Sequence, residues 1–309
     1  MTWSAGTMVT EQVRLARQLG AKADSRAWVA DQLDWKKQVV VKVLATDLPP
    51  DDLEALVELV EKVGAVAELE SPYLAQTFDH AFTDDGVTYR VMELLTGESL
   101  DMRLKKGKLP LREAGEILTQ IAAALTVAHK AGMVHGRIEP GNVFLCKSSE
   151  GPKVKLLNLG VGAIRKPPRT WPYISPEQYL ERAVDHHTDL WSLGEIAYEM
   201  ISGRQPFDAE KRRKLKWEHE PPSELWIADL PAGADGWFAR ALDPKPEKRF
   251  KSAQSMAKAF AAVLTGAKPA AATKEAAPPV VHKVVAVGTP KPEPKVEEED
   301  DGVTIDVEE

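Results

Sequence analysis

The sequence predicts an α+β fold with a β-rich first part and a helical second part, because its apolar residues follow two different patterns. In the first hundred residues, short runs of β-branched and apolar residues separated by turns predict strands at 13–20, 27–33, 38–44, 71–82 and 87–95. Beyond Gly97, apolar residues recur at helical spacing and predict helices at 111–132, 189–203 and 252–266. A sheet is therefore expected to precede a helical unit.

One helix is expected to interrupt the strands of the first part. Residues 50–69 carry apolar residues at helical spacing, and they open with a proline and two aspartates at 50–52. Proline suits the first helical position, and carboxylates suit the positive end of a helix. No internal repeat is visible in the body of the chain.

Composition narrows the class of protein. The chain has 309 residues, of which 43% are hydrophobic, enough for one large two-lobed unit. A single cysteine, Cys146, excludes a disulfide framework and suits the cytoplasm. No Cys/His cluster has zinc spacing, and the adjacent His186 and His187 are expected to be solvated loop residues. We find no signal peptide and no run of the roughly 18 apolar residues that a membrane span needs.

The net charge of −7 is concentrated in the last 44 residues. The tail 266–309 holds five lysines, ten acidic residues and six prolines, and no aromatic residue. Such a segment cannot bury enough surface to offset its ordering entropy, so we expect it to be disordered. The basic run 211–216 is expected to be the solvated face of a helix, and no nucleic-acid partner is expected because the protein around it is acidic.

Seven motifs stand in a recognisable order along the chain. The strand "VVVKVL" contains Lys42, and "YRVMELLTGESL" contains Glu93 and Leu95. They are followed by "HGRIEPGN", "LLNLG", "YISPEQ", "TDLWSLG" and "PEKRF". In this order the motifs resemble those of the protein kinase superfamily, and specifically of the bacterial eukaryotic-like Ser/Thr kinases. The resemblance covers roughly residues 11–266 and implies a two-lobed protein-kinase-like fold.

This resemblance implies a division of the chain. We expect an N-terminal leader at 1–10, a kinase-like first lobe with one helix at 11–95, a helical second lobe at 96–265, and the acidic tail at 266–309.

The resemblance also implies which residues hold the scaffold. Glu177 and Arg249 are expected to form a buried ion pair. Asp189 is expected to accept hydrogen bonds from the backbone near His135 and Gly136. His135 is therefore interpreted as a structural residue, not as a base or a ligand.

The parts that hold ATP in kinases are incomplete in this sequence. Gly20 remains from the glycine-rich loop, but the other positions carry side chains where bare backbone is wanted. Val40 replaces the small alanine that lines the adenine pocket. Lys42 is kept, and its partner on the helix of the first lobe falls on Glu61 or Lys62.

The metal-binding motif has lost its carboxylate. Asn158 stands where the family has an aspartate, and a neutral amide is a poor ligand for Mg²⁺. Asn142, the second metal ligand of the family, is kept. Leu159 replaces a phenylalanine and can still pack, and Gly160 completes the motif.

The loop that carries the catalytic base in kinases is also altered. Arg137 replaces the catalytic aspartate, and Glu139 replaces a lysine. An arginine does not deprotonate in proteins, so Arg137 cannot act as a base. We expect a reversed ion pair between Arg137 and Glu139 that holds the loop shape, with two solvated charges as the alternative. The activation segment is short and has no Ser or Thr between Gly160 and Thr170.

Together these substitutions predict a pseudokinase that is not an enzyme, uses neither ATP nor Mg²⁺ and has no metal site. It would act as a protein-binding scaffold or an allosteric regulator of a partner kinase. The alternatives are a nucleotide-binding sensor and a weak or atypical ATP-dependent transferase. Thr304, set among acidic residues, is a candidate phosphoacceptor that would engage a Ser/Thr kinase or a phosphothreonine-binding domain. A purely solubilising tail is the alternative for this segment.

Overall fold

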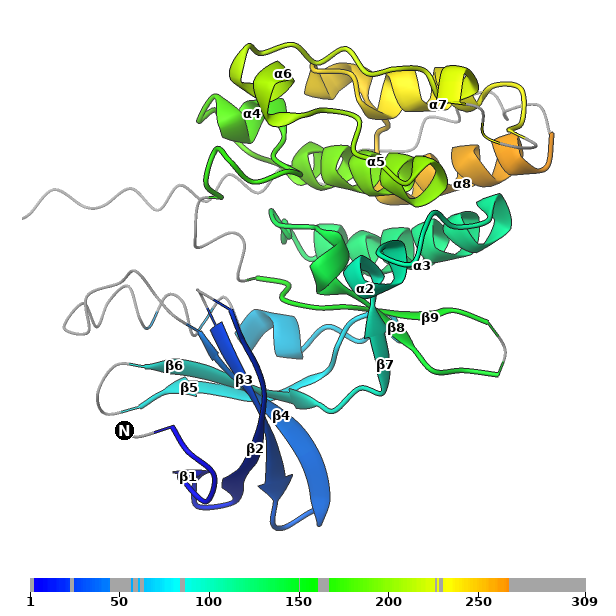
Figure 1. The fold of residues 1–309 in the computed structure, drawn as a ribbon. Helices are drawn as coiled ribbons and strands as arrows, with labels where there is room; N and C mark the ends of the chain where they lie inside the picture. Colours follow the sequence, from blue (N-terminus) through cyan, green and yellow to red (C-terminus); the bar gives the residue numbers. More distant parts are fainter. Residues whose placement is uncertain are drawn as a thin grey trace, which may run out of the picture.

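Two lobes make up the protein, as seen in a computed structural model (Figure 1). The structure describes residues 3–22, 25–44, 57, 61, 64–83, 87–149, 151–160, 167–225, 227 and 230–266. The first lobe is built on a sheet, and the second lobe is mainly helical (Figure 1). The predicted α+β fold is therefore confirmed.

The sheet of the first lobe has six antiparallel strands in the order β1-β2-β3-β4-β6-β5. They are β1 (Met8–Thr10), β2 (Val13–Lys22), β3 (Ser25–Gln32), β4 (Lys37–Leu44), β5 (Thr77–Phe82) and β6 (Thr88–Glu93). All five predicted strands are present, although β5 occupies only the second half of the predicted 71–82. β1 was not predicted. It lies inside the predicted leader and pairs with β2, so the sheet begins before residue 11.

Alternation along the strands gives this sheet two different faces. Val39, Val41 and Val43 of β4 are buried on one face, where they pack with Trp28 of β3 and other apolar residues of the sheet. Lys42 therefore points to the opposite face. Residues 64–67 are helical and cover part of that face, because a Cβ on Gly64 would lie 2.7 Å from the His80 ring of β5.

The second lobe contains seven helices among its described residues. They are α2 (Leu100–Leu104), α3 (Leu111–Lys130), α4 (Pro176–Tyr179), α5 (His186–Ser202), α6 (Ala209–Arg213), α7 (Ala234–Ala241) and α8 (Ala253–Leu264). The three predicted helices of this lobe are confirmed as α3, α5 and α8. None of the described helices is long and apolar enough to cross a membrane.

Short elements of the second lobe lie next to the first lobe (Figure 1). A three-stranded antiparallel sheet has the order β7-β8-β9, formed by β7 (Gly97–Ser99), β8 (Val143–Cys146) and β9 (Lys153–Leu156). Three 3₁₀ turns complete the lobe: η1 (Pro140–Asn142), η2 (Pro222–Leu225) and η3 (Pro246–Lys248). These short elements were not predicted, because three or four residues carry too little periodicity to be recognised.

Helix α5 runs through the core of the second lobe. Its apolar side chains are buried on all sides, among them Trp191, Leu193 and Ile196. His186 begins this helix and is 8% exposed, and its Nε2 lies 3.0 Å from the carbonyl oxygen of Lys251. The expectation that His186 is a solvated loop residue is therefore wrong.

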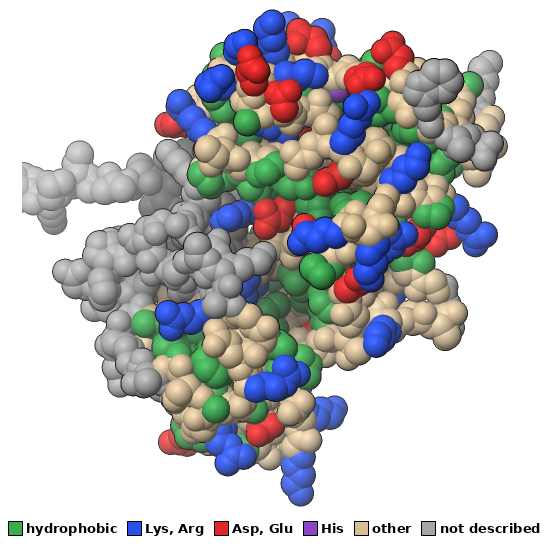
Figure 2. Space-filling model, in the orientation of Figure 1, with side chains coloured by type: hydrophobic (Ala, Val, Ile, Leu, Met, Phe, Trp, Pro, Cys, Tyr) green, Lys and Arg blue, Asp and Glu red, His purple; other side chains and the backbone are tan. Residues whose placement is uncertain are grey.

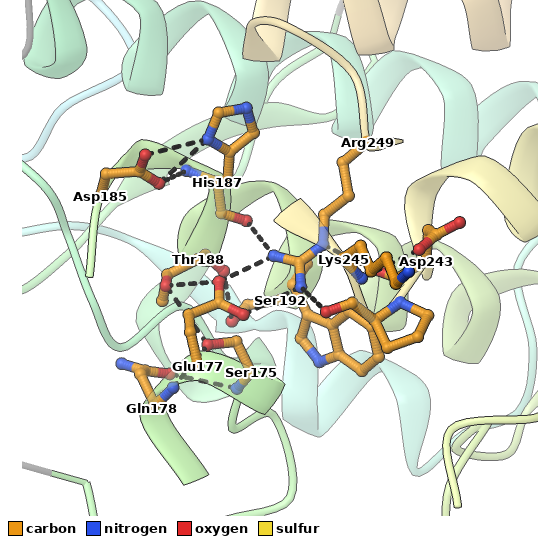
Figure 3. A network of polar contacts seen from close by, with 12 residues as sticks. Ser175, Glu177, Gln178, Asp185, His187, Thr188, Ser192, Asp243, Lys245 and Arg249 are labelled. Atoms are coloured by element: carbon orange, nitrogen blue, oxygen red, sulfur yellow. Dashed lines mark hydrogen bonds and ion pairs between the residues drawn. The ribbon is translucent and has the colours of Figure 1, made fainter. Parts of the chain in front are cut away.

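A buried ion pair joins α4 to the segment after η3 (Figure 3). Arg249 donates two hydrogen bonds to the Glu177 carboxylate, at 2.7 and 2.9 Å, and both side chains are almost fully buried. Burial alone would raise the pKa of Glu177, but Arg249 holds that pKa below its usual value. Thr188 of α5 also donates to Glu177, so the pair ties three segments together. This is the ion pair that the sequence led us to expect.

A second buried ion pair was not expected. Arg212 of α6 is 3% exposed and contacts both carboxylate oxygens of Glu195 on α5, at 3.1 and 3.0 Å. Burial raises the pKa of Glu195 to about 7, against the lowering effect of Arg212. The run 211–216 is therefore not a uniformly solvated face, because its second residue anchors α6 to the core.

Two predictions concern residues outside the described part of the chain. The helix expected at 50–69 is described only at 57, 61 and 64–69, of which 57, 61 and 64–67 are helical. The tail beyond residue 266, which includes Thr304, also lies outside the described residues. The domain boundaries, other than the inclusion of β1 in the sheet, stay predictions.

The Glu177 pair yields a prediction about stability. Arg249→Met should lower the free energy of unfolding by about 3–5 kcal/mol, because it leaves a buried carboxylate without its partner. Removing both charges with Glu177→Gln and Arg249→Met should recover part of that loss. Arg169→Met is the control, since Arg169 pairs with Glu181 at the surface and such pairs contribute about 0–1 kcal/mol. Urea unfolding measures all three variants, and equal losses for Arg249→Met and Arg169→Met would contradict the account.

Candidate functional site

Asp189 holds the loop of residues 134–142 in place. Its carboxylate is fully buried and accepts hydrogen bonds from the backbone N–H groups of His135, at 2.9 Å, and Gly136, at 2.8 Å. His129 of α3 contacts the same carboxylate at 2.8 Å. Burial alone would raise the pKa of Asp189, but His129 and the other partners hold it below its usual value. The loop is thus fixed to a charged group in the core.

Further contacts fix the two residues that Asp189 binds. His135 is fully buried, its Nε2 lies 2.9 Å from the Leu157 carbonyl oxygen, and burial lowers its pKa. The Gly136 carbonyl accepts a hydrogen bond from the side chain of Gln178 at 2.8 Å. Gly136 has a φ of 68°, a conformation that favours glycine. These contacts agree with a structural role for His135.

A chain of hydrogen bonds runs from the sheet of the first lobe to this loop. Lys42 Nζ donates to Asn158 Oδ1 at 2.7 Å, and Asn158 Nδ2 donates to Asn142 Oδ1 at 2.6 Å. Asn142 Nδ2 then donates to the carbonyl oxygen of Arg137 at 2.9 Å. Each asparagine accepts one hydrogen bond and donates the next. An aspartate at 158 could not donate to Asn142, so the amide is required for this connection.

The backbone at Asn158 supports the same connection. Asn158 has a φ of 63°, in the left-handed region that asparagine tolerates better than most residues. Leu159 is 2% exposed and belongs to the core of the second lobe. It packs, as expected for the residue that replaces the phenylalanine of this motif. Gly160 follows with a φ of 82°. The segment 158–160 is therefore held by packing, by backbone shape and by the amide of Asn158.

Glu139 has a different partner from the one that we expected. Its carboxylate accepts a hydrogen bond at 2.7 Å from the indole N–H of Trp171, in the segment that precedes α4. Trp171 is 5% exposed and packs edge-on against Tyr173. The structure places no ion pair between Arg137 and Glu139, both of which it describes, so the reversed pair is wrong. The indole of Trp171 is the stabilising donor that the sequence analysis missed.

The remaining predicted residues lie on the sheet of the first lobe and on the connection to the second lobe, and Figure 2 shows a hollow between the lobes. Glu93 ends β6, and its carboxylate accepts hydrogen bonds from the Gln76 backbone and from Lys155, both at 2.7 Å. Leu95 follows in the connection to the second lobe. Val40 lies on β4 on the same face as Lys42, two residues away. Gly20 lies on β2, where an added Cβ would meet nothing within 4 Å.

Two candidates for the helix partner of Lys42 were predicted, Glu61 and Lys62. Glu61 is helical and exposed, and Lys62 lies outside the described residues.

The site residues fit one of the two groups that a kinase-like fold implies, the phosphate chain of ATP, better than they fit the other, Mg²⁺. Lys42 offers an ammonium group beside Asn158, where the two lobes meet, so the first lobe fits a phosphate chain such as that of ATP. The metal position does not fit Mg²⁺ in the same way. The oxygen atoms of Asn142 and Asn158 already accept hydrogen bonds, and neither residue carries the negative charge that hard cations prefer.

One group of potential metal ligands lies elsewhere, at the start of α5. Asp185, His186 and His187 bring one ligand atom each within 4.8 Å of one another. Asp185 caps α5 by accepting from the His187 backbone, and its carboxylate also contacts His187 Nδ1 at 3.0 Å. His186 contacts Lys251 as described above. These contacts account for the cluster as a helix start.

The chain was compared with known proteins. Residues 13–261 match the family described as protein kinase domain. The serine/threonine-protein kinase PknA of Mycobacterium tuberculosis is 32% identical over 289 residues, 87% of this chain and 65% of PknA. PksC of Streptomyces coelicolor, also named a serine/threonine-protein kinase, is 33% identical over 83% of this chain and 51% of its own length. A probable serine/threonine-protein kinase of Clostridium acetobutylicum is 28% identical over 81% of this chain and 40% of its own length. The chain thus spans less than two thirds of these relatives.

These relatives correct two predictions. They are named as kinases, which are enzymes that transfer phosphate from ATP with the help of Mg²⁺. The predictions of a protein that is not an enzyme and of one that uses neither ATP nor Mg²⁺ are therefore wrong. Both relied on the substitutions at 137 and 158, on Val40, on the degenerate loop at Gly20 and on the short activation segment. They gave too little weight to the cation Lys42 and to the intact loop that Asp189 holds.

The amide chain yields a prediction about metal binding. Asn158→Asp should make the protein respond to Mg²⁺, because it supplies a carboxylate next to Asn142 and ends the hydrogen bond that fills the Asn142 oxygen. At ten times its dissociation constant, Mg²⁺ should then stabilise the variant by about 1.4 kcal/mol relative to EDTA. The native protein and the control Asn158→Gly, which tolerates the same backbone shape, should respond less than the variant. Urea unfolding with and without Mg²⁺ measures this effect. An equal response of all three proteins would contradict our description of the metal position.

Proposed function

The chain belongs to the protein kinase family, and from this membership we propose that it is an atypical ATP-dependent protein kinase with slow turnover. The observation that carries the proposal is the hydrogen bond of 2.7 Å between Lys42 of β4 and Asn158. This hydrogen bond places the ammonium group of Lys42 beside Asn158, which in turn contacts the loop 134–142 through Asn142. The names of the bacterial relatives support the same reaction type.

In this proposal the residues of the chain act mainly through charge and position. Phosphoryl transfer needs positioned groups and cations more than covalent help from the protein. Bound ATP would supply the phosphoryl group, and Lys42 would hold its phosphate oxygens. The segment that contains Glu93 and Leu95 would hold the adenine ring of ATP. Because the amides at 142 and 158 do not suit Mg²⁺, we derive no step through a metal held by the chain.

Glu139 is the carboxylate of the loop 134–142 in this proposal, and it can accept the proton of a substrate hydroxyl. The indole N–H of Trp171, in the segment that precedes α4, donates to the Glu139 carboxylate and holds it in place. The guanidinium of Arg137 cannot serve as a base, but it can stabilise phosphate oxygens. A base that is displaced from its usual position explains why turnover would be slow.

A second candidate function follows because the contacts that hold the fold are kept, while two positions of the catalytic motifs are changed. The ion pair of Glu177 with Arg249 and the anchor at Asp189 are intact, while positions 137 and 158 carry no carboxylate. This contrast favours an additional role as a scaffold or allosteric regulator of a partner kinase. The tail, with Thr304, would supply a contact to that partner or to a phosphothreonine-binding domain. A pull-down that compares the full chain with a chain lacking 267–309 tests this role, since loss of all partners without the tail is the expected result and equal partner sets would contradict it.

Transfer of γ-labelled phosphate from ATP tests the first candidate. We expect measurable transfer to protein at about 10²- to 10⁴-fold below the usual 1–100 s⁻¹ of kinases, because the base is displaced. Lys42→Met should abolish it, whereas the control Lys37→Met, an exposed lysine of the same strand, should keep it. Transfer that persists in Lys42→Met, or no transfer by the native protein over hours, would contradict the proposal.

A further inference from the structure

An open groove of about 440 Å³ lies on the second lobe, between the segment that follows α6 and helix α7. The indole of Trp217 and the rings of Pro221 and Pro244 line it, and α7 contributes Gly236 and Ala239. An added Cβ on Gly236 would meet nothing within 4 Å, so the described chain leaves this space open. Because α6 and α7 lie at the end of the second lobe farthest from the first lobe, the groove is separate from the candidate site between the lobes (Figure 1).

Contacts with the core fix the walls of this groove. Arg249 donates to the carbonyl oxygen of Asp243 at 2.8 Å, so the residue that pairs with Glu177 also holds one wall (Figure 3). On the other wall, Trp217 packs edge-on against Trp191 of α5. Proline-rich segments dock in grooves lined by aromatic rings, because their extended conformation is already formed and loses little entropy on binding. The preformed apolar walls therefore suit a proline-rich ligand.

The groove is also acidic. Glu218, Asp235 and Asp243 line it, and no lysine or arginine of the described residues does so. Ser223 donates to the Asp235 carboxylate, and the backbone N–H of Lys245 donates to the Asp243 carboxylate, which holds both acids without neutralising them. Within the described ranges, none of the three carboxylates forms an ion pair with a lysine or an arginine. The groove therefore suits a ligand that carries positive charge as well as proline.

Basic side chains lie directly before the groove. Arg213 ends α6 and Lys216 precedes Trp217, and both basic residues are exposed. Among the residues that the structure describes, neither one has an acidic partner. An acidic groove and a basic helix end are thus adjacent on one surface. A ligand whose charge changes sign along its length would match both of them.

The tail of this chain has that division of charge. Residues 267–295 hold all five lysines and all six prolines of the tail with two acidic residues. Residues 296–309 hold the other eight acidic residues and no lysine. The proline-rich part of the tail is therefore its positive part, and the negative part follows it.

The tail also starts close enough to reach the groove. A Cβ on Gly233, just before α7, would lie 3.8 Å from Val263 near the end of α8, so the tail leaves α8 beside α7. A flexible chain of about 25 residues, the separation in sequence of Gly266 and Lys291, spans roughly 25–30 Å. Helix α7 has 8 residues and is therefore less than half as long. The length of the tail thus allows its proline-rich part to lie in the groove.

We propose that the tail docks on the second lobe of its own chain. The segment 289–295, "TPKPEPK", lies in the groove, where its lysines meet the three carboxylates and its prolines pack on Trp217. The acidic end 297–309, with Thr304, then lies along the basic side chains that precede the groove. A protein partner of the tail must displace it from this surface. Because the groove lies away from Lys42, the inference does not depend on phosphate transfer.

Disulfide trapping in the full chain tests this inference, with the single native cysteine removed by Cys146→Ser. Lys291→Cys is combined with Gly236→Cys in the groove, or with Arg112→Cys as the control. Arg112 is exposed at the start of α3, and the end of α8 packs against Gly115 of the same helix, so a tail that does not dock reaches both positions. We expect the intramolecular disulfide to form at least about tenfold faster with Gly236→Cys, because docking raises the local concentration of the second thiol.

Charge reversal in the same full chain tests how the tail is recognised. Glu218→Lys with Asp243→Lys should slow disulfide formation in the groove about fivefold, as loss of two surface ion pairs implies. Arg213→Glu with Lys216→Glu should also slow it, because the acidic end of the tail is then repelled. Glu247→Lys, at an exposed position outside the groove, is the control and should leave the rate unchanged.

Three outcomes would overturn the inference. Equal rates for Gly236→Cys and Arg112→Cys would show that the tail does not dock in the groove. Rates that both charge reversals leave unchanged would rule out recognition by charge. Disulfide-linked dimers in place of the intramolecular product would show that the tail of a second copy occupies the groove. Since none of these results involves transfer of phosphate, the inference and the proposed function can fail separately.

Discussion

The buried carboxylate of Asp189 is the constraint on which the rest of the site depends. A charge with no exposure to solvent must be compensated, and here two backbone N–H groups and His129 do so. The compensation fixes the backbone at 135–136, and the loop that follows it ends at Asn142 in the turn η1. Because the loop position is set from the core, side chains at 137 and 139 can change without loss of the scaffold. The fold therefore persists although the residues at 137 and 139 differ from those of the family motif.

The side-chain amides of Asn158 and Asn142 connect the first lobe to this fixed loop, and Asn158 stands where the family motif has a carboxylate. The hydrogen bonds from Lys42 through Asn158 and Asn142 reach the Arg137 carbonyl without any negative charge. Lys42 donates to the side chain of Asn158, and the buried Arg90 donates to the carbonyl oxygen of Leu159. The two amides are poor ligands for Mg²⁺, because neither carries the negative charge that hard cations prefer.

The sequence predicted the long elements and the scaffold contacts, because these rest on periodicity and on motif order. The helices α3, α5 and α8 and the Glu177 pair are examples. The contacts of charged side chains were predicted wrongly where several partners are possible choices. Glu139 pairs with Trp171 and not with Arg137, and Arg212 turns inward from a run of basic residues. Such choices depend on packing between distant segments. Arg90 had a signal in the strand pattern, since it occupies a buried alternate position between Thr88 and Met92, and an arginine there is unusual.

A crystal structure of the complex grown with ATP and Mn²⁺, in which the anomalous signal of manganese locates the metal, tests the central claim most directly. We expect the hydrogen bond between Asn158 and Asn142 to stay intact, with Lys42 in contact with phosphate oxygens. Any manganese would then lie on the phosphates, away from the two amides. An anomalous peak between the amide oxygens of Asn142 and Asn158, with their hydrogen bond broken, would show that the two amides hold the metal and that this expectation is wrong.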